Sequence, residues 1–206
     1  MEFDKIEYKT LDEASEASLK NSQDFQYEAK LLLKLKSYGH SKSLAILGIE
    51  EFGKSIGYRL LAQFKKIPIR GRIHFNPNEL LLDLQKSHLT KQSIALIFTV
   101  LSNFTNEELL RLKRNMDKNG LSIEYSKRKK KFSNFENVSK DLFSFKKWSN
   151  EINLLPDLDR TKQTGLYVEI NDTHDVNKPW KSIANESKKI NQLLDKLLSD
   201  YNKFFI

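Results

Sequence analysis

The chain has 206 residues, 39% of them hydrophobic and 30% charged, which is typical of globular proteins and excludes an intrinsically disordered chain. It has no cysteine, so disulfides and thiolate metal sites are excluded, and its most apolar run, residues 94–101, is far shorter than the roughly 20 residues of a membrane span. The formal net charge is +8, and the charged amino terminus is unlike a signal peptide, so we expect a cytoplasmic protein that does not contact membranes.

Helical spacing of apolar residues extends through the first 120 positions. It predicts four helices, over residues 11–38, 41–66, 77–103 and 105–120. Gly39 is expected to end the first, and the third begins with Asn76 as N-cap and Pro77 at the first helical position. Pro68 and Gly71 disfavour helix between the second and third helices, which are therefore expected to fold back as an antiparallel hairpin.

The carboxyl-terminal third has a weaker pattern. Residues 121–177 are expected to form an irregular insert with a short strand near residues 166–170, where the sequence alternates and contains β-branched residues. Pro179 then opens a last amphipathic helix. No stretch rich in Pro, Gly or Ser marks a linker, so residues 1–206 are predicted to be one all-α domain, a bundle of about five helices with a short β element in its carboxyl-terminal third.

Charged residues interrupt the apolar second helix. At helical spacing one stripe contains Leu44, Leu47, Glu51, Lys54, Tyr58 and Leu61. Glu51 and Lys54 thus stand at positions expected of core residues, although Glu and Lys are seldom buried without a partner. They are expected either to pair within the helix or to face polar groups of another segment.

The third predicted helix offers such groups, because His88 and Lys91 interrupt its own apolar stripe. In an antiparallel hairpin the two sets of polar residues lie at similar heights, each about 20 Å from the connecting loop. We therefore predict one buried or half-buried cluster between the two helices, made of Glu50, Glu51, Lys54, His88 and Lys91.

Most of the surplus positive charge lies in one segment. Residues 111–131 contain nine basic and two acidic residues, and the charge is densest at Lys127, Arg128, Lys129, Lys130 and Lys131. Such a run is either a solvated surface or a binding surface, for RNA, for the ribosome or for an acidic protein partner.

Four blocks of sequence share a pattern with a known family. They are Leu19-Lys-Asn21, Tyr38-Gly-His-Ser-Lys-Ser-Leu-Ala-Ile-Leu-Gly-Ile-Glu-Glu-Phe-Gly-Lys54, His88-Leu-Thr-Lys91 and Asp157-Leu-Asp-Arg-Thr-Lys-Gln-Thr-Gly-Leu-Tyr-Val-Glu169, the last followed by a proline and Trp180. In this order they resemble the AbiV family of bacterial abortive-infection proteins. The resemblance implies an HEPN-like helical bundle, a role in phage defence and, as in many HEPN domains, a homodimer.

One HEPN pattern is missing from this chain. HEPN ribonucleases typically carry an arginine followed, after four to six residues, by a histidine. Here Arg70 precedes His74 by only three intervening residues, and no other pair has the required spacing. Ribonuclease activity therefore does not follow from the resemblance.

The predicted cluster has three interpretations. It is a salt-bridge network that fixes helix register, a surface for self-association, or a catalytic site. In a catalytic site, Lys54 and Lys91 would hold a phosphate while His88 and Glu51 exchange protons, with Glu50 in a binding role. Adjacent lysines repel cations, so no metal is expected, and nothing in the sequence indicates a cofactor.

Two functions follow. The first is an interaction protein, activated by a phage-encoded protein, that arrests growth through an effect on translation. The alternative is an HEPN-type ribonuclease or nucleotide-handling toxin that uses the Glu-Glu, Lys and His cluster. The missing arginine-to-histidine spacing favours the first function.

Overall fold

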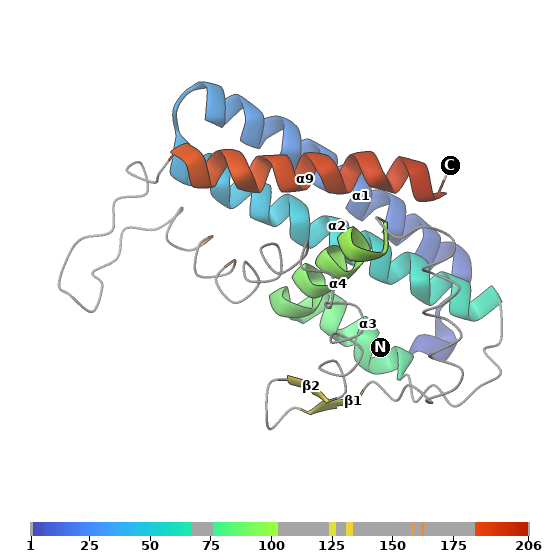
Figure 1. Cartoon of the computed structure of the whole chain (residues 1–206). Coiled ribbons are helices and arrows are strands. Elements are labelled where there is room, and N and C mark those ends of the chain that lie inside the picture. Colours follow the sequence, from blue (N-terminus) through green and yellow to red (C-terminus); the bar gives the residue numbers. More distant parts are fainter. Residues whose placement is uncertain are drawn as a thin grey trace.

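The protein is a bundle of helices. The computed structural model describes residues 2–66, 76–102, 124–126, 131–133 and 184–205, together with Leu158 and Lys162. The helices of these residues are α1 (Tyr8–Lys34), α2 (Tyr38–Lys66), α3 (Pro77–Lys86), α4 (His88–Leu101) and α9 (Ala184–Phe205), and a short 3-10 helix, η1 (Phe3–Lys5), precedes α1 (Figure 1). The expected all-α fold is confirmed.

The first two helices form a long antiparallel hairpin held by buried hydroxyl groups. Ser15 Oγ donates to the carbonyl oxygen of Ser55 (2.9 Å), and Ser22 Oγ donates to that of Gly48 (2.7 Å). In the same way Ser41 Oγ of α2 donates to the carbonyl oxygen of Ala29 (2.7 Å). These contacts recur every seven residues along both helices, the spacing of a coiled-coil seam. Small side chains on the seam let the two backbones approach closely.

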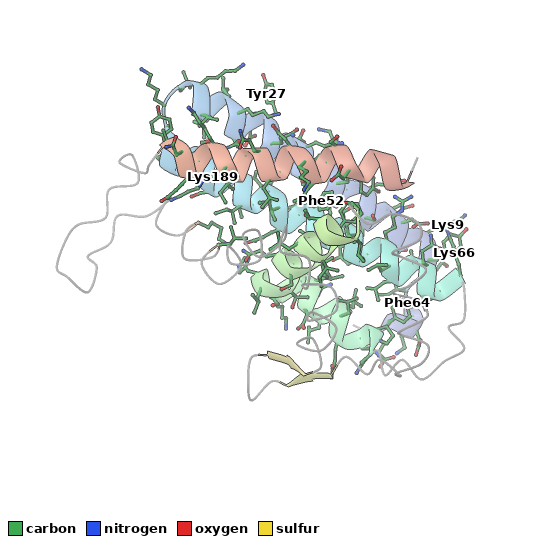
Figure 2. All side chains as sticks on the ribbon, viewed as in Figure 1. Lys9, Tyr27, Phe52, Phe64, Lys66 and Lys189 are labelled. Atoms are coloured by element: carbon green, nitrogen blue, oxygen red, sulfur yellow. The ribbon has the colours of Figure 1, made fainter. Side chains whose placement is uncertain are left out.

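The other helices pack onto this hairpin, and α2 is its central element. In Figure 1, α9 runs along the hairpin, while α3 and α4 lie on another side of α2. Phe52 of α2 sits at the centre of the bundle (Figure 2), with ring centroids 5.3 Å from Phe98 of α4 and 6.0 Å from Tyr201 of α9. Leu158 belongs to the same core. Because neighbours cover several sides of α2, its buried residues do not fall on one stripe.

Two helix boundaries differ from the sequence-based expectation. The helix predicted over residues 77–103 is broken at Ser87, whose backbone is extended (φ −98°, ψ 109°) and whose Oγ accepts a hydrogen bond from the Thr90 amide, as a helix N-cap does. The first helix ends at Lys34, and Lys36 adopts a left-handed conformation with φ of 59°. Gly39 consequently lies inside α2 and does not end α1.

Some of the other expectations are confirmed, one element was not expected, and the rest concern residues outside the described ranges. The Asn76 side chain accepts from the next amides and Pro77 starts α3, as predicted. An antiparallel β1 (Glu124–Ser126) and β2 (Lys131–Ser133) occur in the insert, where the sequence analysis had not placed them. The predicted helix over residues 105–120, the strand near 166–170 and the start of the last helix at Pro179 lie outside the described residues.

Two further expectations concern membrane spans and the number of domains. No helix in the described ranges has the length and apolar character needed to cross a membrane. The assignment of residues 1–206 to one domain stays a prediction. The structure shows that α2 contacts α1, α3, α4 and α9. Residues of α2 belong to both hydrophobic clusters of the described chain, one shared with α4 and α9 and the other with η1, α1 and α3.

Gly53 is expected to be indispensable for the packing of α4 on α2. A Cβ at this position would overlap the backbone carbonyl of Lys91, which cannot move without shifting α4. Gly53→Ala should therefore lower the free energy of unfolding by about 3 kcal/mol in urea denaturation. Gly57→Ala is the matched control, because the three atoms nearest to its Cβ all belong to the side chain of Leu84 and not to a backbone, and a loss of about 1 kcal/mol is expected there. Equal losses would contradict this account.

Candidate functional site

Glu50 is a buried carboxylate in the middle of α2, with 2% of its surface exposed. Its Oε1 accepts hydrogen bonds from Gln92 Nε2 (2.8 Å) and Lys162 Nζ (2.9 Å), and its Oε2 lies 2.6 Å from His88 Nδ1. The donors come from α4 and from the segment that carries Lys162. A carboxylate can be buried at this depth because charged and polar donors replace the water that it loses.

The contact with Glu50 determines the tautomer of His88. Glu50 Oε1 already accepts from Gln92 and Lys162, so the carboxylate acts as an acceptor, and a separation of 2.6 Å between its Oε2 and His88 Nδ1 requires a proton on Nδ1. Lys162 Nζ lies 3.3 Å from the same nitrogen, but two donors cannot bond to each other, so both donate to Glu50. In the neutral ring Nε2 then carries the lone pair. About half of the His88 side chain is exposed (49%), so the ring borders solvent while Nδ1 is held by Glu50.

Lys162 reaches Glu50 from a segment anchored at two points. Ser43 Oγ of α2 donates to the Lys162 carbonyl oxygen (2.8 Å), and Leu158, four residues earlier, is buried in the core. Lys162 itself is buried. Its ammonium is therefore held in place by backbone and core contacts as well as by the carboxylate.

Glu51 and Lys54 are placed differently from Glu50. Glu51 Oε1 pairs with Lys54 Nζ at 3.2 Å, one of the two arrangements that the sequence predicts. Glu51 Oε2 also lies 3.4 Å from Asn21 Nδ2, so this carboxylate faces α1. Both members of the pair are partly exposed. Thus the carboxylate that meets His88 is that of Glu50, and a proton exchange between Glu51 and His88 has no direct contact to support it.

The Lys91 side chain is largely buried close to this cluster, but its ammonium nitrogen keeps some contact with solvent. Only 7% of its surface is exposed, and within the described ranges its ammonium makes neither a hydrogen bond nor an ion pair. Burial lowers the pKa of this ammonium, the Glu50 carboxylate partly offsets the effect, and the positive charge of Lys54 adds to it. Lys91 is therefore the uncompensated charge of the cluster.

Two members of the site are not predicted from the sequence, and several predicted binding residues lie outside the described part of the chain. Gln92 and Lys162 were not singled out, although Lys162 lies within residues 157–169, a block that carries the family resemblance. Lys127, Arg128, Lys129 and Lys130 lie outside the described residues, and for Lys131 only the backbone is described, as the start of β2. The basic binding surface stays a prediction.

The donor set does not indicate a metal. In the described part of the chain no three His, Asp or Glu side chains gather in an arrangement that could hold an ion. What the arrangement can do chemically is exchange a proton at His88 Nε2, with Glu50 fixing the ring, next to the positive charge of Lys91.

One family model covers almost the entire chain. The model, described as AbiV, matches residues 10–199, a span that includes every residue of the cluster. No curated protein and no solved structure matches the chain.

Lys91→Met should stabilise the fold at neutral pH. The lowered pKa means that, between this value and the ordinary lysine pKa of about 10.4, the folded chain binds fewer protons than the unfolded chain. The free energy of unfolding of the unmodified protein therefore rises with pH across this window, and the advantage of Lys91→Met should shrink towards pH 10.4. Urea denaturation over a pH series measures this. Lys189→Met, at an exposed position of α9, controls for the loss of one charge, and a pH-independent advantage would contradict the prediction.

Proposed function

The chain belongs to the AbiV family, and on that basis we propose that it is an antiphage abortive-infection protein, which responds to a phage product and arrests growth. The single observation that carries this proposal is the family match over residues 10–199. A cytoplasmic homodimer is part of the proposal, as is a phage-encoded protein as the activator.

Within this role the first mechanism is interaction with protein partners that affects translation. The missing arginine-to-histidine spacing at Arg70 and His74 favours interaction over HEPN-type cleavage. Large apolar side chains with four-residue spacing also lie exposed at the end of α1, namely Tyr27 (71%), Leu31 (48%) and Leu35 (68%). Figure 2 shows Tyr27 on the outer side of α1. An exposed apolar stripe of this kind supports docking of the phage-encoded protein there.

Leu31→Lys should reduce protection from phage, because it places a charge in the centre of the stripe. A change at the centre of an interface weakens binding by about tenfold or more, so the efficiency of plaque formation should rise correspondingly. Leu60→Lys is the control, since Leu60 is also exposed but lies near the opposite end of the hairpin. Unchanged protection by Leu31→Lys, with both variants folded, would remove this surface from the mechanism.

The second candidate function is an enzyme, either an HEPN-type ribonuclease or a nucleotide-handling toxin. The observation that favours it is the 2.6 Å contact between Glu50 and an otherwise half-exposed His88. A carboxylate that fixes one imidazole nitrogen while the other stays accessible is the arrangement used by general bases. In this candidate Glu50 orients the ring, whereas the sequence predicts that Glu51 exchanges protons with His88.

Two substitutions at His88 separate the mechanisms. His88→Ala removes the ring, whereas His88→Asn keeps an N–H donor near Glu50 but cannot exchange protons at neutral pH. The interaction mechanism expects both folded variants to protect cells as the unmodified protein does, measured by plaque formation. Loss of protection in both folded variants, with binding of the partners retained, would contradict the interaction mechanism and favour the enzyme. Protection by His88→Asn but not by His88→Ala would show that His88 acts through its hydrogen bond to Glu50, a structural role, and not through proton exchange.

A further inference from the structure

The exposed apolar stripe at the end of α1 has different charges along its two edges. Lys30 lies on the edge that faces α9, because its Nζ pairs with Asp195 of α9 at 2.7 Å. Lys34 follows one helical turn later on the same edge, and its side chain is exposed. Glu28 lies on the opposite edge. The stripe therefore runs between a basic border towards α9 and an acidic border away from it.

Helix α9 brings further lysines to the basic border. Its start lies beside the turn between α1 and α2, where Lys42 of α2 pairs with Glu186 at 3.3 Å (Figure 1). Lys188 precedes Asp195 by seven residues, so it lies on the face of α9 that is turned towards α1. Lys189 comes next, and Figure 2 shows it at this end of the bundle. Both lysines are exposed.

The positive charge at this end is not balanced within the described residues. Asp195 and Glu186 already pair with Lys30 and Lys42. Four exposed lysines make no ion pair in the described ranges, namely Lys34, Lys36, Lys188 and Lys189. Hydrated lysines need no partner for stability, but beside an apolar stripe they determine which charge a bound surface can carry.

The dimensions of the stripe match those of a helix. Its three residues are four positions apart, so they extend about 12 Å along α1, which corresponds to two turns of a helix laid against them. A helix with apolar residues at positions i, i+4 and i+7 would cover the stripe, and carboxylates beside these residues would meet the lysines. Two copies of this chain joined at the same surface would instead bring lysines together, which is unfavourable.

We propose that the apolar stripe and its lysine-rich border form a docking site for an acidic amphipathic helix of a partner protein. The phage-encoded protein proposed above docks on the same surface, so the site rests on that proposed function, to which it adds the chemistry of the partner. The apolar contacts hold the helix, whereas Lys34 and Lys188 select it by charge and accelerate its association.

Fluorescence anisotropy with two synthetic peptides tests the site. Both peptides have about 20 residues and one leucine stripe, and they differ only in carrying glutamate or lysine beside it. The unmodified protein should bind the glutamate peptide, more weakly as salt increases, and should bind the lysine peptide about tenfold more weakly or worse. Lys34→Glu/Lys188→Glu should reverse the preference between the peptides, and Leu31→Lys should weaken binding of the glutamate peptide about tenfold.

Lys9→Glu/Lys86→Glu is the matched control. It makes the same change of charge, with Lys9 near the start of a helix as Lys188 is and Lys86 in the last turn of a helix as Lys34 is. Figure 2 shows Lys9 at the end of the bundle opposite to Lys189. All four lysines are exposed, so both double variants should fold, which urea denaturation checks. The control should keep the preference of the unmodified protein.

Several results would overturn the proposal. They are failure to bind either peptide, equal binding of both peptides, and equal effects of the two double variants. Binding of phosphatidylglycerol vesicles in place of the peptides would assign the surface to a membrane, and self-association that is lost in Leu31→Lys would assign it to a second copy. Both outcomes would also contradict the proposal. Phage protection is measured separately, so such a failure would leave the abortive-infection role intact.

Discussion

The Glu50 carboxylate is the interaction on which the arrangement of the site depends. It lies on the helix that contacts most of the others, where an ionised group without donors would be strongly destabilising. Gln92 and His88 satisfy it from α4, and Lys162 does so from a segment far along the chain. The same contacts fix the first turn of α4, the tautomer of His88 and the position of Lys162. One buried charge thus ties together the core and the accessible edge of the site.

The helices themselves follow from the sequence more completely than the faces that they bury. The all-α fold, the Asn76 and Pro77 start of α3 and the proximity of His88 to an acidic residue of α2 follow from capping and helical spacing. The choice between Glu50 and Glu51 does not, because a helical stripe identifies the buried face only when one face is buried, and α2 has neighbours on several sides. Both residues are adjacent in sequence, yet they contact different helices.

The remaining differences have local or long-range causes. Ser87 breaks the predicted third helix by capping α4, and a serine within an apolar pattern carries too little information to show this. Lys162 reaches Glu50 across 112 positions of sequence, and no periodicity connects residues so far apart. Lys162 stands out only through the block of residues that resembles the AbiV family. Its geometric role comes from the three-dimensional structure alone.

The serine seam between α1 and α2 would look almost the same if one helix were shifted by seven residues along the other. Shifting one helix by seven residues, about 10 Å, would set Ser15 against Gly48 and Ser22 against Ser41, again small residues facing each other. Hydroxyl-to-carbonyl bonds on this seam therefore hold the two helices together without selecting a unique alignment between them. The alignment is instead selected by the tight turn at Lys36 between α1 and α2, because so short a connection cannot accommodate a shift of seven residues. The few residues of the turn between α1 and α2 thus determine which of two closely related pairings these two helices adopt.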